Sequence, residues 1–443
     1  MDYSISSMLK NDGFECACGK KHFALISDVI IESKAVNRLP ELIKKHGGTK
    51  AFVLADENTL KAGKSAFDAL KSSGIAHTLF KFGSKPLEPD EQAVGSAVMH
   101  YDYTCDIIVG IGSGVINDIG KILAAMTGKK YIIVATAPSM DGYASATSSM
   151  ARDGLKVSLA SKCPDAVLAD LDILCSAPMR MLQAGVGDMI AKYISICEWQ
   201  LAHIIVGEYY CETVATIVKK ALEKCKKSAH GLVSRDPDAV KAVMEGMVIS
   251  GIAANYAGVS RPASGVEHYF SHVWDMRGLE FNTPVDLHGI QCGVAVPLSL
   301  KAYEYVRTIT PNREKALRYA RSFSFDDYCG FLRENMGSGA QAMIDGEYKE
   351  HKYDVAKHEK RLDIIIKNWD KICAVIDREL PPYKEIIDLL KSIGAPTSPT
   401  DFNISEDEIK NAFIITKDIR DKYVVTRLLW DLGELKNAQK TII

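Results

Sequence analysis

Short runs of apolar and β-branched residues alternate with longer segments of mixed character in the first part of the chain. The runs are residues 24–31, 51–56, 77–82, 105–112 and 131–138. Residues 33–47, 57–74 and 90–102 carry apolar residues at helical spacing and end in polar residues or glycine. This alternation is typical of a parallel sheet with crossover helices. It predicts a doubly wound, nucleotide-type fold.

The pattern changes after Pro178, where the strand signals fade. Residues 181–205 and 238–258 show the long apolar periodicity of helices. Residues 337–358 are polar and predict a mobile connection or a loose helix, and residues 362–435 return to helical spacing, interrupted by a loop at 394–402. We therefore expect an α/β protein: a Rossmann-like parallel-sheet NAD-binding domain over residues 1–178, followed by an all-α metal- and substrate-binding domain over 179–443.

Composition and charge narrow the classes of partner. The 443 residues include 47% hydrophobic and 25% charged residues, with 54 basic against 56 acidic side chains. Such a balance gives no general electrostatic attraction for nucleic acid or an anionic membrane. The N-terminal residues lack a basic segment followed by an apolar run, and no stretch reaches about 18 apolar residues. We expect a cytoplasmic protein without a membrane span.

Eleven cysteines are scattered along the chain, which is typical of reduced thiols rather than of a disulfide framework. Cys16, Cys18 and His22 form a CxCxxxH cluster with ligand types that zinc accepts. The second cysteine pair that structural zinc sites usually need does not follow nearby. The sequence by itself therefore argues against a structural metal there.

Residues 106–121, DIIVGIGSGVINDIGK, pass from a buried strand through glycines into a helix. Gly112, Ser113 and Gly114 would expose backbone N–H groups at a helix N-terminus, where a pyrophosphate binds. The order departs from the simple dinucleotide-binding fingerprint, because the acidic residue at a strand end, Asp56, precedes the glycines instead of following them. Asp56 could still accept hydrogen bonds from a ribose. The alternative is a tight strand-to-helix turn without a ligand.

Two acidic residues stand among small residues. Asp141 lies in residues 134–149, where hydroxyl-bearing and small side chains follow an apolar run, and this loop could line a cofactor or substrate. The alternative is a plain solvated turn. Asp188 lies at the head of a long helix, after glycines that would let a ligand approach. The alternative for Asp188 is a simple helix-start acid favoured by capping.

Three of the 11 histidines fall between residues 265 and 289. His268 and His272 are one helical turn apart, and His288 comes from the next element. Together with Asp188, His268 and His288 would supply one oxygen and two imidazoles and leave positions open, as a catalytic metal site requires. Such a metal can polarise a carbonyl, and His272 would then hydrogen-bond the substrate. The alternative is two half-buried helix histidines and an unrelated turn histidine.

These segments resemble the iron-dependent alcohol dehydrogenase-like superfamily, which includes glycerol dehydrogenase, glycerol-1-phosphate dehydrogenase and dehydroquinate synthase. Residues 110–121 resemble its glycine-rich cofactor loop. Residues 136–149, 185–193, 264–275 and 287–293 are similar, in the same order, to motifs of the glycerol-1-phosphate dehydrogenase branch. Residues 15–23 and 419–433 resemble the bacterial form of that branch.

The resemblance implies NAD(P)H-linked, metal-dependent, reversible reduction of dihydroxyacetone phosphate to sn-glycerol 1-phosphate. It implies a place in phospholipid metabolism and a homodimer. The implied metal, zinc or nickel, lies on Asp188, His268 and His288, and the implied substrate contacts are Asp141, Asp188 and His272. The implied cofactor contacts, for NAD in preference to NADP, are Asp56, Gly112, Ser113, Gly114, Val115, Ile116, Thr136, Ala137, Pro138, Ser139 and Ser145.

Three other functions remain open at this point. A glycerol or polyol dehydrogenase would use the same metal and cofactor on an unphosphorylated substrate. A dehydroquinate synthase-like cyclase would need several cationic side chains for its anionic substrate, and mainly Arg261 and Arg277 lie near the histidines in the sequence. A catalytically inactive scaffold would be favoured by loss of a metal ligand, yet all three predicted ligands are present.

Overall fold

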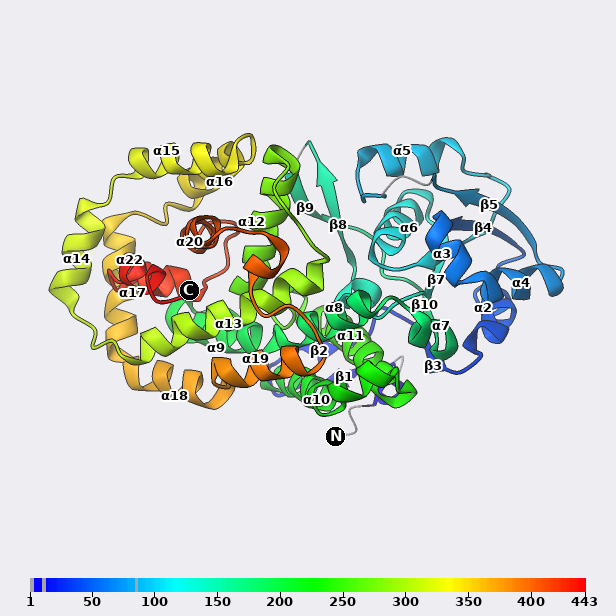
Figure 1. Ribbon diagram of the computed structural model, residues 1–443, viewed down its shortest axis with the longest axis horizontal. Helices are drawn as coiled ribbons and strands as arrows, with labels where there is room; N and C mark the ends of the chain where they lie inside the picture. Colours follow the sequence, from blue (N-terminus) through cyan, green and yellow to red (C-terminus); the bar gives the residue numbers. More distant parts are fainter. Residues whose placement is uncertain (1–3, 10–12, 84–86, 154) are drawn as a thin grey trace. The chain divides into compact units, whose positions relative to one another are not determined.

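A six-stranded parallel sheet forms the first part of the chain in the computed structural model, which describes residues 4–9, 13–83, 87–153 and 155–443 (Figure 1). Its spatial order is β3-β10-β7-β6-β4-β5, with every neighbouring pair parallel. The strands are β3 (Asp28–Glu32), β4 (Lys50–Ala55), β5 (Ala76–Lys81), β6 (Ile107–Gly112), β7 (Lys130–Ala135) and β10 (Ala166–Asp170). The predicted fold class is confirmed.

The strand order places a topological switch point between β4 and β6. From β4 the chain crosses to β5 on one side, and then returns past β4 to β6 and onward to β7 and β10 on the other. In open α/β sheets of this kind, ligands bind outside the carboxyl ends of the strands at the switch point. The fold therefore marks the ends of β4 and β6 as a ligand position.

Apolar side chains pack on both faces of the sheet. Val53 and Val109 share a core with Leu39, Ile43 and Leu70 of the helices on one face. On the other face the ring of Phe52 lies 5.0 Å from that of Tyr101. The elements between and after the strands are η1 (Ala35–Arg38), α2 (Leu39–Lys45), α3 (Glu57–Ala62), α4 (Lys64–Ser72), α5 (Glu91–Met99), α6 (Gly114–Thr127) and α7 (Leu171–Ser176).

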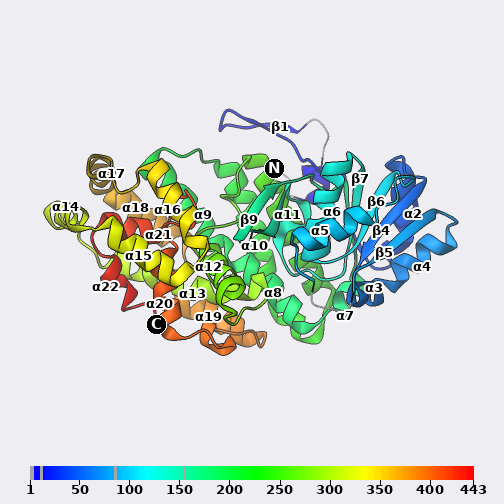
Figure 2. The ribbon, with the colours of Figure 1, turned by 90° about the horizontal axis from the view of Figure 1, so that it is seen from above.

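Several elements differ from the pattern-based prediction. Segment 33–47 divides into a 3₁₀ turn and α2, and segment 57–74 breaks into α3 and α4 at Gly63. The central strand β10 was missed, as were two antiparallel hairpins of short strands. These hairpins pair β1 (Phe14–Glu15) with β2 (Lys21–His22), and β8 (Thr147–Arg152) with β9 (Leu155–Ala160). Figure 2 shows the β1–β2 hairpin apart from the six-stranded sheet.

Helices make up the regular structure after Pro178, apart from short 3₁₀ turns, throughout the described residues. Segment 181–205, predicted as one helical stretch, is divided between two helices. The polar segment 337–358 contains helix α16, which agrees with the helix rather than the mobile connection among the two predicted alternatives. The helices are α8 (Met179–Ile190), α9 (Lys192–Val206), α10 (Glu212–Ser228), α11 (Pro237–Ala257), α12 (Val266–Phe281), α13 (His288–Arg307), α14 (Arg313–Ser322), α15 (Phe325–Met336), α16 (Gly339–Glu350), α17 (Val355–Lys367), α18 (Trp369–Glu379), α19 (Tyr383–Ser392), α20 (Glu406–Ile415), α21 (Val425–Asp431) and α22 (Leu435–Gln439).

The chain forms two compact units that interleave in sequence. The first contains Met1–Met189 and Glu212–Ser260, and the second contains Ile190–Cys211 and Arg261–Ile443. Helices α10 and α11 thus pack within the unit that holds the sheet. The predicted single boundary between residues 178 and 179 stays a prediction. Over the described ranges, no helix combines the length and apolar character needed to cross a membrane.

A buried cluster of charges lies among the C-terminal helices of the second unit. The Nζ of Lys417 donates to Oδ2 of Asp418 at 2.7 Å and lies 3.3 Å from the centroid of the Tyr328 ring. Arg427 also donates to Asp418. Burial lowers the pKa of Lys417 to about 8, with Arg427 adding to the effect and Asp418 opposing it. This cluster uses charge to hold helices together inside the unit.

Candidate active site

The carboxyl ends of β4, β6 and β7 bring three predicted cofactor residues into one row. In the parallel register of the sheet, Leu54 of β4 pairs with Gly110 of β6, and Gly112 of β6 pairs with Ala135 of β7. Thr136 continues the ladder by donating its N–H to the Gly112 carbonyl at 3.0 Å. Asp56, which directly follows β4 two positions after Leu54, therefore lies beside Gly112 at the switch point.

Helix α6 starts at this edge and directs its first N–H groups toward it. Its N-cap residue, Ser113, makes no side-chain capping bond to the helix. The hydroxyl instead lies 2.6 Å from Ser139 Oγ and accepts from Tyr143 Oη at 3.3 Å. First-turn N–H groups without a capping side chain, at the start of a 14-residue helix, suit an anionic group. Gly114 and Val115 are half-buried there, and Ile116 is buried.

Glycine at position 112 is a steric requirement. A Cβ there would lie 2.5 Å from Cβ of Ile116, closer than packed carbons approach. Gly112 therefore permits the tight strand-to-helix turn whether or not a ligand binds. The tight-turn alternative and the cofactor interpretation are thus compatible. The same turn sets the helix start at the switch point.

Asp56 has a structural role that the sequence analysis missed. Its Oδ1 accepts from the Thr59 N–H at 2.8 Å, and Thr59 Oγ1 accepts from the Asp56 N–H at 3.0 Å, which forms a capping box on α3. Aspartate followed three positions later by threonine was a visible signal for this cap. A ribose contact by Asp56 would use its other carboxylate oxygen.

The loop after β7 is partly buried and held from several sides, which disfavours the solvated-turn alternative. Ala137, Pro138 and Ser139 are buried. Tyr143 Oη donates to the Ala137 carbonyl at 2.6 Å. Lys121 Nζ, itself buried, donates to the Gly142 carbonyl at 3.2 Å. Rigid anchoring of this kind is what a loop that positions a ligand needs.

Three predicted contacts occupy defined places in and beside this loop. Asp188 is buried near the end of α8, not at a helix start as predicted, so the helix-start alternative is wrong, and its Oδ2 accepts from the Asp141 N–H at 2.8 Å. Asp141 Oδ2 accepts from Ser250 Oγ of α11 at 2.8 Å. Ser145 turns its hydroxyl to the Thr147 carbonyl at 3.0 Å. The structure thus brings Asp141 and Asp188 together and adds Ser250, which no sequence motif indicated.

Glycine before Asp188 allows the loop to reach α8. A Cβ on Gly185 would lie 2.0 Å from the Pro138 carbonyl oxygen. The sequence predicted that small residues here admit a close approach. The group that approaches is the loop backbone itself, which brings Asp188 to the loop that carries Asp141.

The predicted histidines converge in the second unit. His268 and His272 lie on α12, and His288 is the first residue of α13. The ring centroids of His268 and His288 are 5.0 Å apart, and those of His272 and His288 are 6.3 Å apart. Unrelated helix and turn histidines would not meet in this way, so this alternative loses its support.

Neighbouring side chains orient two of these imidazoles. Nδ1 of His268 lies 2.8 Å from Glu267 Oε1, and Nδ1 of His288 lies 3.0 Å from Ser271 Oγ. Because Nδ1 of each ring faces a neighbouring side chain, Nε2 is the nitrogen that would face a metal. A carboxylate on the second nitrogen of a ligating histidine is a common feature of metal sites. Glu267 is such a carboxylate, and the sequence analysis missed it.

A buried acid supports the start of α12. Glu198 Oε2 accepts from the Val266 N–H at 2.9 Å, and its Oε1 accepts from Val425 at 2.8 Å and from Tyr303 Oη at 3.2 Å. Burial, reinforced by the charge of Glu267, raises the pKa of Glu198 to about 8. Glu198 therefore links α9, α12 and α21 behind the histidines.

Cys292 joins the histidine pair as a further candidate ligand. One ligand atom from each of His268, His288 and Cys292 lies within 4.8 Å of the other two. Cys292 Sγ is 3.6 Å from Nε2 of His288, one helical turn away on α13. The i, i+4 spacing of His288 and Cys292 was a signal that the sequence analysis did not use. Asp188 belongs to the first unit and the histidines to the second, so their union in one metal site stays a prediction.

The two arginines considered for an anionic substrate are engaged elsewhere. Arg261 is buried, pairs with both carboxylate oxygens of Glu208 and donates to the Tyr423 carbonyl at 3.0 Å. Arg277 donates to the Asn335 carbonyl at 2.6 Å and pairs with Glu408 at 3.2 Å. Both guanidinium groups thus hold the helices of the second unit. A cyclase that relies on these two cations is disfavoured.

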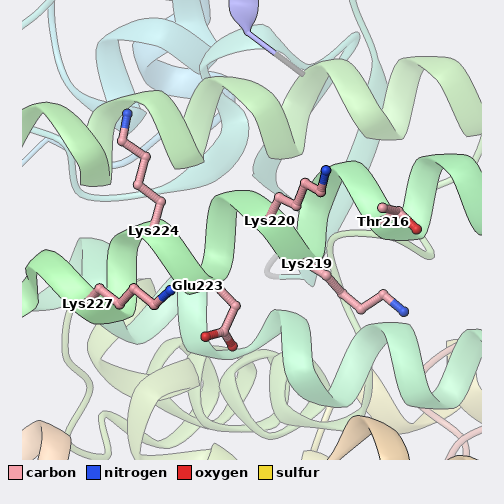
Figure 3. A pocket seen from close by; sticks show the side chains of 6 residues that line it. All are labelled: Thr216, Lys219, Lys220, Glu223, Lys224 and Lys227. Atoms are coloured by element: carbon pink, nitrogen blue, oxygen red, sulfur yellow. The ribbon is translucent and has the colours of Figure 1, made fainter. Parts of the chain in front are cut away.

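A hollow along α10 lies outside this set of residues (Figure 3). It is lined by Thr216, Lys219, Lys220, Glu223, Lys224 and Lys227. Lys219 pairs with Glu212 and Lys224 with Glu245. Because all these side chains come from one helix and two of the lysines pair with acids, the hollow is part of a charged helix surface. None of the predicted site residues lines it.

Comparison with known sequences agrees with these observations. A family model described as iron-containing alcohol dehydrogenase matches residues 30–178. The chain is 34% identical over 295 residues to a glycerol-1-phosphate dehydrogenase [NAD(P)+] of Halalkalibacterium halodurans, covering 66% of this chain and 74% of that protein. It is 27% identical over 441 residues to the Bacillus licheniformis protein of the same name, covering 98% and 96%.

A solved structure shares the fold. The crystal structure of glycerol dehydrogenase from Schizosaccharomyces pombe superposes with a TM-score of 0.61 at 14% identity. The match covers 97% of this chain and 93% of that one. At this identity the likeness concerns the fold, and it extends over both the sheet and the helical part.

Proposed function

The chain belongs to the glycerol-1-phosphate dehydrogenase family, within the iron-containing alcohol dehydrogenase superfamily, and from this premise we propose that it reversibly reduces dihydroxyacetone phosphate to sn-glycerol 1-phosphate. A hydride from the reduced nicotinamide would go to the ketone carbon, and a proton to the ketone oxygen. The observation that carries the proposal is the pair His268 and His288, with both Nδ1 atoms engaged by neighbours.

In this proposal the cofactor lies at the ends of β4 and β6. The first turn of α6, with Gly112, Ser113, Gly114, Val115 and Ile116, would hold the pyrophosphate. Asp56 would accept from the adenosine ribose and repel a 2′-phosphate, which favours NAD(H) over NADP(H). Thr136, Ala137, Pro138, Ser139 and Ser145 would line the rest of the cofactor from the buried loop.

The predicted donor set fits a divalent metal. Two imidazoles with engaged Nδ1 atoms have the arrangement of a histidine metal site, and Asp188 would add a carboxylate oxygen. We propose zinc or nickel, because both accept nitrogen and oxygen ligands. Such a metal supplies Lewis acidity to a carbonyl oxygen.

Asp141 and His272 would hold the substrate. Ser250 and the loop keep the Asp141 carboxylate at a fixed position, so it could accept from a substrate hydroxyl. His272 lies one turn from His268, where its imidazole could hydrogen-bond the substrate and hold a proton near the ketone oxygen. These contacts orient the ketone for hydride transfer.

Three finer features belong to the same proposal. We propose a homodimer, which light scattering would show as twice the mass of one 48.6 kDa chain. We propose the cytoplasm, because all eleven cysteines are outside disulfides in the structure. The product would supply glycerol phosphate to phospholipid metabolism.

The stereochemistry of the product tests the proposal. Purified protein is incubated with NADH and dihydroxyacetone phosphate, and the glycerol phosphate formed is offered to an enzyme that oxidises only sn-glycerol 3-phosphate. We expect the product to resist that oxidation. Complete oxidation would assign the opposite enantiomer and overturn the assignment.

A further inference from the structure

We propose that Cys16, Cys18, His22 and Cys211 form a second metal site, a closed structural site for zinc. One ligand atom of each residue lies within 4.8 Å of the other three. In a zinc tetrahedron with Zn–S bonds of about 2.3 Å, the sulfur atoms are about 3.8 Å apart. A small closure around the ion would therefore complete the coordination.

The β1–β2 hairpin presents three of the ligands. The Cys16 N–H donates to the Lys20 carbonyl at 3.1 Å, and the Gly19 N–H donates to the Cys16 carbonyl at 3.0 Å. Gly19 has a φ of +83°, a conformation that favours glycine. This tight turn brings Cys18 Sγ to 3.3 Å from Nε2 of His22. The contact has the size expected for two ligands of one ion.

His22 is oriented in the manner of a metal ligand. The imidazole is buried, and its Nδ1 lies 2.8 Å from the Tyr256 carbonyl of α11. A carbonyl only accepts hydrogen bonds, so Nδ1 carries the proton and the lone pair of Nε2 faces Cys18. Metal-ligating histidines commonly engage their second nitrogen in this way. A histidine that served only to fill the core would not need Nε2 directed at a thiol.

The fourth ligand comes from a distant part of the sequence. Cys211 is the residue at which the first segment of the second unit ends, and its peptide bond joins it to Glu212, the first residue of α10 in the unit that holds the hairpin. Cys16 Sγ lies 3.3 Å from Oγ1 of Thr213, two residues after Cys211. Cys211 is buried. The fold thus brings in a fourth ligand, Cys211, from far along the chain. The argument against zinc in the sequence was that no further cysteine pair follows near Cys16 and Cys18.

The ligand set assigns the kind of site. Three thiolates and one imidazole complete a tetrahedral sphere, which is the Cys₃His set of structural zinc. No position is left for a substrate, in contrast to the predicted site of Asp188, His268 and His288. Zinc here would tie the N-terminal hairpin to the start of α10.

Metal analysis tests the site separately from catalysis. Wild-type protein and the variants Cys18→Ser, Cys211→Ser and His288→Asn are purified with zinc, dialysed against EDTA and analysed by mass spectrometry for metal per chain. Cys175→Ser is the matched control, because Cys175 is a half-buried thiol of the first unit outside the cluster. We expect about one retained zinc in the wild type, in Cys175→Ser and in His288→Asn. We expect at least about tenfold less in Cys18→Ser and Cys211→Ser.

Cobalt provides a second measurement on the unaltered chain. Cobalt-loaded wild type should show the strong thiolate-to-cobalt absorption and visible bands of a tetrahedral sulfur site, and His288→Asn should keep them. Retention of equal zinc by the cysteine variants, or an absence of thiolate-to-cobalt absorption in the wild type, would overturn the proposal. Because His288→Asn removes a predicted catalytic ligand, failure of the proposed function would leave this result unchanged.

Discussion

Individual side chains show which parts of the site the sequence could predict. Motif spacing identified Asp141, Asp188 and the three histidines, and the structure pairs Asp141 with Asp188 and His268 with His288. It could not identify Ser250, because that residue meets Asp141 from a helix 109 positions away. Glu267 and Cys292 were within reach, because Glu267 directly precedes His268 and Cys292 follows His288 by four positions.

Substitutions of His272 and His288 should have different effects on metal content and activity. His288→Asn should lose the catalytic metal and nearly all activity, because a predicted ligand is gone. His272→Asn should keep the metal and lose kcat/KM by about 100-fold, because it removes a group that hydrogen-bonds the substrate. Metal content and steady-state kinetics measure both, with the exposed His203→Asn as control. Equal metal loss in the His272 and His288 variants would refute the division of roles.

Lys417 should make stability depend on pH. Its pKa is about 8 in the fold against the ordinary 10.5, so between these values the unfolded chain binds the proton and the folded chain does not. The free energy of unfolding should therefore rise with pH, by about 2 kcal/mol between pH 7.5 and 9.5 relative to Lys417→Met. Chemical denaturation at several pH values measures this difference. A constant difference between wild type and variant would show that Lys417 keeps its proton in the fold.

A strand could be predicted from the sequence where a single apolar run corresponds to a single strand. β4, β6 and β7 follow directly from runs whose side chains are buried on both faces of the sheet. β10 was missed because acids border its short run. The structure uses those acids: Asp165 accepts from the Tyr131 N–H, and Asp170 accepts from the Val36 N–H. Long-range partners thus compensate for poor local strand propensity.

The junction of β4 and α3 tests the cofactor assignment. Asp56→Asn keeps a good N-cap, so the free energy of unfolding should change by less than about 0.5 kcal/mol. It removes the charge that repels a 2′-phosphate, so the kcat/KM ratio of NADPH to NADH should rise about tenfold. Asp90→Asn is the matched control, because Asp90 caps α5 in the same unit by accepting from Ala93. An unchanged cofactor ratio would restrict Asp56 to its capping role.

For the molecule as a whole, the pattern of apolar residues was enough to predict a parallel sheet followed by helices. It could not show that α10 and α11 return to the unit of the sheet, because helical periodicity carries no information on which core a helix joins. The same return brings Cys211 to the N-terminal hairpin. Contacts between residues almost 200 positions apart therefore decide where the cysteine cluster forms.

The consumption of NADH by purified protein tests the central proposal most directly. Dihydroxyacetone phosphate is compared with unphosphorylated dihydroxyacetone, each before chelation, after chelation and after addition of zinc or nickel. We predict turnover of the phosphate ester that is abolished by the chelator and restored by metal, with little turnover of dihydroxyacetone. Equal or faster turnover of dihydroxyacetone, or activity that survives complete metal removal, would contradict the account.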